Sequence, residues 1–321
     1  FGVLKAGKLG EFIPNNVIKG MMAAIGFILI MKQIPHLVGY DHDFEGDEDF
    51  SQLDGENTFT EVIIALLRIT PAAALVGFVS ILILMIWELK ALKQFTFFRW
   101  LPGSLVVVIL GLIYTKVTQG TDWAMSMEHL VNVPVVSNLR DWPQQLNFPN
   151  FSGIFNHNVW IVAVTLAIVA SLESLLGVEA VEKLDPKKRN TPSNLELMAQ
   201  GCGNMVSGLL GGIPVTSVVV RSTANISAGA THKMSTILHG CFLLISVVLF
   251  PQLLNAIPLA SLAAVLIFVG YKLVKPSIFK ELWNQGKIQF LPFIITFLAI
   301  IATDLLKGIG IGLLVGIFFV V

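Results

Sequence analysis

The polar groups with the clearest chemistry lie in residues 205–232, inside an otherwise apolar sequence. Gly211, Gly212 and Pro214 oppose a continuous helix there, because glycine leaves the backbone free and proline lacks an N–H. Residues 218–220 could form an extended piece or begin a new helix. In a bilayer such a break is tolerated only where it is buried in protein or lines a wet cavity.

Anion binding is the chemistry that this break predicts. A half-helix starting near Val219 or Val220 would point backbone N–H groups and the positive end of its dipole at the break. Arg221, in the first turn of that helix, adds a full positive charge.

Glu173 is a second ionisable group, inside the otherwise uncharged run VWIVAVTLAIVASLESLLG. A carboxylate at such depth costs on the order of 3 kcal/mol unless it has a partner or water. We therefore predict a functional role for Glu173. The alternative is a protonated or paired carboxylate that only packs helices.

The elements that must position these groups are membrane helices. Hydrophobic residues make up 55% of the chain and charged residues 13%, whereas a soluble domain has about 25% charged residues. At roughly 20 apolar residues per crossing, we predict an all-α polytopic membrane protein with about ten segments. The predicted segments are 14–38, 60–89, 101–118, 157–181, 194–210, 219–229 (short), 233–251, 258–274, 288–304 and 305–321.

Composition also excludes other classes. The net charge of zero gives no argument for nucleic-acid binding. Cys202 and Cys241 lie in apolar runs and are expected to be small core residues rather than a disulfide. The scattered histidines show no metal-ligand spacing, and no nucleophile–base pair indicates an enzyme. Because the first and last residues resemble interrupted segments, we expect the chain to be a fragment.

Loop charges predict the orientation. The first loop is acidic and is expected to be solvated, exterior and without a cation-binding role. Its acids are Asp41, Asp43, Glu45, Asp47, Glu48, Asp49, Asp54, Glu56 and Glu61. Basic loops near residues 90–99, 183–189, 232–233 and 272–287 are expected on the cytoplasmic side.

Residues 171–235 resemble the signature region of the SulP family of inorganic anion transporters. Four motifs follow in family order: N-x-E-L-x-A-Q-G at 194–201, G-N-x-x-S-G at 203–208, G-G-x-P-x-T at 211–216 and R-S-x-x-N-x-x-A-G at 221–229. Similarity extends to both ends of the chain.

The resemblance implies fourteen membrane segments in two inverted seven-segment repeats, divided into a core domain and a gate domain. This chain would hold segments five to fourteen: gate segments in 1–156, core segments in 157–251 and gate segments in 252–321. The first four segments and the family's cytoplasmic STAS domain would be absent. We further expect a homodimer in the plasma (inner) membrane, with no cofactor beyond a coupling Na⁺ or H⁺.

The resemblance and the residues together predict which groups bind the anion. The anion would be held by the N–H groups of Val220, Arg221 and Ser222, the hydroxyls of Thr216, Ser217 and Ser222, and the charge of Arg221. Glu173 falls on the acidic position of sodium-coupled bicarbonate members, which have aspartate there. Gly177 falls where they have threonine, and both departures argue against sodium coupling.

The predicted function is secondary active transport of a small inorganic anion, sulfate or bicarbonate, by movement of the core against the gate. A nucleobase or ascorbate carrier of the same architecture is one alternative, although no Gln or Asn faces the break before Asn225. An anion-binding membrane motor or scaffold without turnover is another.

Overall fold

Helices make up almost all of the regular structure. The computed structural model describes residues 1–7, 14–41, 57–89, 91–92, 94–95, 98, 101–135, 146–303 and 305–320. Within these ranges there is no strand, and Leu130 and Pro258 form an isolated antiparallel bridge. The predicted all-α class is confirmed.

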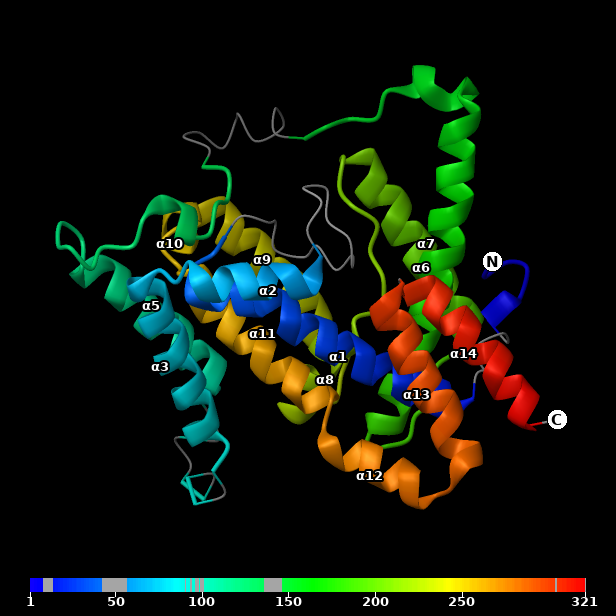
Figure 1. Ribbon diagram of the computed structural model, residues 1–321. Coiled ribbons are helices and arrows are strands. Elements are labelled where there is room, and N and C mark those ends of the chain that lie inside the picture. The colour runs from blue at the N-terminus through cyan, green and yellow to red at the C-terminus, as the bar shows by residue number, and fades with distance from the viewer. Residues whose placement is uncertain are drawn as a thin grey trace. The chain divides into compact units, whose positions relative to one another are not determined.

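The helices follow the predicted segments closely (Figure 1). From the N-terminus the chain contains α1 (Asn15–Val38), α2 (Thr58–Leu67), α3 (Pro71–Trp87), α5 (Gly103–Val117) and the short 3₁₀ turns η2 (Met127–His129) and η4 (Phe151–Phe155). Then follow α6 (His157–Leu184), α7 (Ser193–Leu209), α8 (Val219–Ser227), α9 (Met234–Leu249), α10 (Pro251–Leu254), α11 (Leu259–Leu273), α12 (Pro276–Asn284), α13 (Lys287–Ala302) and α14 (Leu305–Val320).

One predicted segment, 60–89, is wrong as a single helix. It is split into α2 and α3, which are bent by 113° relative to each other. Pro71 occupies the start of α3, where its missing N–H and fixed φ are tolerated but a helix continuing from α2 is not. Hydropathy is equally high on both sides of the break, so it could not reveal the bend.

The lengths of the helices limit which of them can cross a bilayer alone. Asn15–Val38, His157–Leu184 and Leu259–Asn284 are long and apolar enough, and the bent pair α2 and α3 gives a fourth span if counted together. The third of these runs continues from α11 into α12. Shorter apolar helices are Gly103–Val117, Met234–Leu249, Lys287–Ala302 and Lys307–Phe319.

The chain divides into two compact units. Unit 1 comprises Phe1–Ile18 and Val136–Leu243, and unit 2 comprises Lys19–Val135 and Leu244–Val321. Unit 1 contains α6, α7 and α8, and unit 2 contains most of the remaining helices. The assignment of core and gate roles to residues 1–156, 157–251 and 252–321 stays a prediction.

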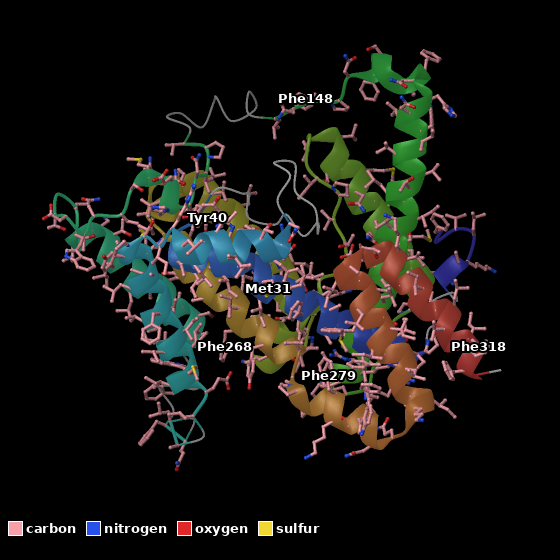
Figure 2. All side chains as sticks on the ribbon, in the orientation of Figure 1. Met31, Tyr40, Phe148, Phe268, Phe279 and Phe318 are labelled. Carbon is pink, nitrogen blue, oxygen red and sulfur yellow. The ribbon has the colours of Figure 1, made fainter. Side chains whose placement is uncertain are left out.

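Close helix contacts in unit 2 depend on small residues. α3, α5 and α11 pack together, as do α13 and α14. A Cβ on Gly312 of α14 would collide with the Thr296 side chain of α13, and Gly308 meets Ile300 in the same way. These two glycines are therefore packing residues, and their four-residue spacing puts them on one face of α14. On α12, Phe279, labelled in Figure 2, packs its ring 4.9 Å from the ring of Phe293 of α13.

Two expectations about polar and thiol groups are wrong. Asp41 and Glu61 are not solvated: the side chain of Asp41 is 4% exposed and that of Glu61 3%, because each has basic partners inside unit 2. The other acids of the first loop, and residues 42–56 generally, lie outside the described residues. Cys202 and Cys241 are free, as expected, but exposed, because no other described part of the chain covers their faces of α7 and α9.

Candidate anion site

The break between α7 and α8 is formed by residues 211–218 in non-helical conformation. Gly211 has φ of +78°, a left-handed conformation that glycine adopts at low cost, and it ends α7 just after Leu210. The N–H of Gly212 then donates to the carbonyl of Ser207 over 2.8 Å. Residues 213–218 have no strand partner, so their backbone groups need other acceptors and donors.

Three side chains of α7 supply those partners. Asn204 pairs with both backbone groups of Val215: its Nδ2 donates to the carbonyl over 3.0 Å and its Oδ1 accepts from the N–H over 2.6 Å. Gln200 Nε2 donates to the same carbonyl over 3.0 Å and to Ala170 of α6 over 3.3 Å. Ser207 Oγ donates to Ile213 over 2.8 Å. These bonds give Ile213 and Val215 of the broken backbone partners within the protein, the kind of support that a break in a bilayer needs.

The expectation that no Gln or Asn faces the break before Asn225 is wrong, because Gln200 and Asn204 both bond to Val215. The sequence contained a signal for these three residues of α7 that our prediction did not use. Positions 200, 204 and 207 are spaced by four and three residues, so they share one face of α7. A polar stripe on an apolar helix that precedes a helix break indicates side chains that hold the broken backbone.

Helix α6 supports the other end of the break. The N–H of Ser217 donates to the buried Ser174 Oγ over 3.1 Å. Three residues further along α6, a Cβ on Gly177 would lie 2.9 Å from Ser217 Oγ, so the lack of a side chain allows the segment to approach. Gly177 stands where sodium-coupled members of the family have threonine. In this chain the glycine allows close packing of the broken segment against α6.

Glu173 meets the break directly. Its half-buried side chain accepts a hydrogen bond from the Thr216 hydroxyl. The structure therefore brings together two of the predicted residues from different elements, the carboxylate of α6 and the first hydroxyl of the binding segment. This contact places an ionisable group beside the segment that precedes α8.

Helix α8 begins at Val219, which decides between the extended and helical alternatives for residues 218–220. The N–H of Ser222 donates to the carbonyl of Val218 over 3.1 Å, so it is used within the helix. The amides of Val220 and Arg221 precede this bond, in the turn where a helix provides no acceptor of its own. Ser222 can therefore offer a ligand its hydroxyl, whereas the expectation for its N–H is wrong.

Arg221 is exposed in the first turn of α8. Among the described residues, no carboxylate lies within ion-pair distance of its guanidinium. Its charge is thus not neutralised by Glu173, and it adds to the positive end of the helix dipole.

We expect Gly177→Ala to destabilise the protein, because the added Cβ would meet Ser217 at 2.9 Å and the backbone segment would have to shift. The cost of such overpacking is about 1–3 kcal/mol. A matched control is Gly201→Ala on α7, where a Cβ would meet nothing within 4 Å. Thermal unfolding should show a lower Tm for the first variant only, and equal Tm values would contradict the packing role of Gly177.

The fold and the geometry of the candidate site indicate the class of protein to which this chain belongs. Apolar helices, a broken segment held by polar side chains and a half-helix whose N-terminus faces the break are the features of substrate sites in secondary transporters. The sequence profile of the sulfate permease family matches residues 1–296. The chain belongs to this family, which is the one indicated by the SulP motifs.

Similar proteins have transport functions in their names. The putative sulfate transporter YvdB of Bacillus subtilis is 27% identical over 99% of this chain and 56% of its own length. The bicarbonate transporter BicA of Picosynechococcus sp. is 26% identical over 98% of this chain and 52% of its own length. The chain therefore spans about half the length of these curated relatives.

Solved structures show the same fold. The transmembrane domain of a cyanobacterium bicarbonate transporter BicA superposes with a TM-score of 0.69 at 23% identity, covering 99% of this chain and 72% of that one. The structure of SLC26A9 gives a TM-score of 0.68 at 17% identity, covering 99% of this chain and 49% of that one. The chain thus has part of the 7+7 inverted-repeat architecture, as predicted.

Proposed function

We propose that the protein is a secondary active transporter of small inorganic anions, of the sulfate or bicarbonate class. The observation that carries this proposal is the broken segment 211–218, held by α6 and α7 and followed by a half-helix with Arg221 in its first turn. Membership of the sulfate permease family supports it, as do relatives named as sulfate and bicarbonate transporters.

In this proposal the anion binds at the N-terminus of α8. The amides of Val220 and Arg221, the hydroxyls of Ser217 and Ser222, and the guanidinium of Arg221 hold it. The Thr216 hydroxyl joins them once neutralisation of Glu173 releases its proton from that carboxylate. A helix N-terminus contributes about 0.3–1 kcal/mol when exposed and up to ~2 kcal/mol when partly buried. Such modest affinity suits a carrier, which must release its substrate on the other side.

Glu173 is the proposed coupling residue. Its hydrogen bond to Thr216 connects the carboxylate to the same segment that binds the anion. An ionised carboxylate repels an approaching anion, so binding a coupling H⁺ or Na⁺ at Glu173 would favour anion binding. Transport then follows when the domain carrying α6 to α9 moves against the gate.

The proposed assembly is a homodimer in the plasma (inner) membrane. The proposal rests on family membership, and the basic loops are placed on the cytoplasmic side.

Flux measurements with the full-length protein test the function. We expect proteoliposomes to accumulate labelled sulfate or bicarbonate, and uptake of nucleobase or ascorbate to be absent. Anion-dependent charge movement without net flux would instead favour a membrane motor. Uptake of a nucleobase or ascorbate alone would contradict an inorganic substrate.

We expect Thr216→Val to weaken anion binding by about 2- to 10-fold, the effect of one lost hydrogen bond of 0.5–1.5 kcal/mol. The Tm should change little, since the shape of the side chain is kept. Thr165→Val is the matched control, because Thr165 is exposed on α6 and, among the described residues, its hydroxyl donates to Ile161 of its own helix alone. Binding isotherms for sulfate and bicarbonate give the comparison. Unaltered affinity with a lowered Tm would show that Thr216 serves packing.

A further inference from the structure

A second cluster of titratable groups lies in unit 2 and shares no residue with the proposed anion site. The carboxylate of Asp41 is held between two imidazoles: His36 Nδ1 lies 2.6 Å from Oδ1, and His129 Nδ1 lies 2.5 Å from Oδ2. The side chains of His36 and Asp41 are each 4% exposed, and that of His129 is 10% exposed. Neither the proposed anion site nor the proposed coupling residue uses these groups.

The geometry determines where the protons are. A carboxylate is an acceptor only, so each Nδ1 must carry a hydrogen to make its bond. With both imidazoles neutral, the triad has a net charge of −1 in a buried place, which is costly. One further proton on the Nε2 of His129, which faces Glu128 at 3.7 Å, makes an imidazolium and brings the net charge of the triad to zero.

The other charged groups that face the cluster come from three elements. Lys32, one turn before His36 on α1, pairs with Glu61 of α2 over 3.7 Å, and both are buried. Glu128 of η2 lies 3.7 Å from His129 Nε2 and is exposed. α3 and α11, which pack in the same unit, carry no ionisable residue along the lengths near this end, and residues 42–56 lie outside the described residues.

The fields of these groups favour one bound proton. The hydrogen bond that His129 donates to Asp41 raises the pKa of His129, burial lowers it, and the charges of Asp41 and Glu128 raise it, with a net increase above 6.5. Burial alone would raise the pKa of Asp41, but hydrogen bonds and charge from His129 and His36 outweigh it and lower this pKa below 3.8.

The cluster connects segments that are distant in sequence. Asp41 follows the C-terminal end of α1, whereas His129 lies in η2, whose following residues are anchored to the loop before α11. The N–H of Val131 donates to Ile257 over 3.0 Å, and Asn255 pairs with both backbone groups of Val133 over 2.6 and 2.8 Å. The triad is therefore the polar connection between the end of α1 and this anchored loop.

We propose that His36, Asp41 and His129 form a proton-binding latch, which holds the end of α1 to the η2 loop when one proton is bound and loosens at alkaline pH. The latch is independent of the proposed transport activity, because it is defined by contacts within unit 2. It gives the protein a pH-sensitive element separate from Glu173.

The sign of the pH dependence follows from the directions of the pKa shifts of His129 and Asp41. The pKa of His129 is raised in the folded state. Its contribution to the stability of the fold is therefore complete below the unfolded-state pKa near 6.5, and it is lost as the pH rises through the folded-state pKa. Asp41, with a lowered pKa, contributes above 3.8 and loses its contribution only under acid conditions. The latch is thus strongest between pH 3.8 and pH 6.5, and it weakens as the pH rises above 6.5.

Thermal unfolding of the full-length protein at pH 6 and pH 9 tests the latch. Between these pH values the parent should lose more Tm than Asp41→Asn, by on the order of a few °C. His157→Gln, which removes an exposed histidine, should behave as the parent. Ionisations elsewhere in the protein cancel in this difference.

His129→Gln provides a second test should Asp41→Asn fail to fold. The glutamine amide can still donate to Asp41 but does not titrate in this range. This variant should keep most of the Tm at pH 9 and lose the extra stability of the parent at pH 6. The same pH dependence in the parent and in either folded variant would overturn the proposal.

Discussion

Arg221→Ala is expected to reduce anion binding and transport by on the order of tenfold, equivalent to about 1.4 kcal/mol. The guanidinium lies in the first turn of α8, exposed and without a carboxylate partner among the described residues, so its charge acts on whatever binds at the break. Arg221→Glu should be more severe, because it places a negative charge at the same position. Uptake kinetics in proteoliposomes and binding isotherms give the two measurements.

Two controls separate charge at the site from charge in general. Lys233→Ala removes an exposed cation near the start of α9 and should leave uptake unchanged. Arg221→Lys keeps the charge and should retain most of the affinity. If Arg221→Ala transports with parental kinetics, the arginine is only a structural cation, and the anion site must be sought elsewhere.

Glu173→Gln is expected to abolish the response of transport to a proton or sodium gradient while anion binding is kept. The amide resembles the protonated carboxyl in shape and charge and can still interact with the Thr216 hydroxyl. Because an ionised carboxylate at this depth costs on the order of 3 kcal/mol, neutralisation should accompany substrate binding in the parent. The measurement is uptake with imposed pH or sodium gradients.

Glu179→Gln is the matched control for this prediction. Glu179 lies on the same helix but pairs with Lys183 over 3.1 Å, and its loss should leave the gradient response intact. A parental response to the same gradient in Glu173→Gln would show that the coupling ion binds at another group. A response to sodium only, or to protons only, in the parent identifies the ion.

Most of the helices were predictable because they coincide with the apolar runs of the chain. The boundaries of α8 were also predictable, since Gly211, Gly212 and Pro214 limit where a helix can start. The bend between α2 and α3 was not, because the helices on both sides of it are strongly apolar. Pro71 was the one local sign of it.

The candidate site was predictable only in part. Sequence spacing indicated Arg221 and the hydroxyls of the break, and the depth of Glu173 indicated a functional carboxylate. The hydrogen bond between Glu173 and Thr216 joins residues 43 positions apart in a contact that no local pattern specifies. The same holds for Asp41 and His129, whose bond spans 88 positions and converts an expected solvated acid into a buried one.

Substrate protection of a single cysteine tests the location of the anion site most directly. Ser222→Cys would be introduced into the full-length protein with every native cysteine replaced by serine, and labelled with an anionic methanethiosulfonate. Thr231→Cys, on the exposed loop after α8, is the control. The account predicts that bicarbonate or sulfate slows labelling at position 222 and not at position 231. Labelling at position 222 that is unaffected by either anion, in a protein that still transports it, would contradict anion binding at the N-terminus of α8.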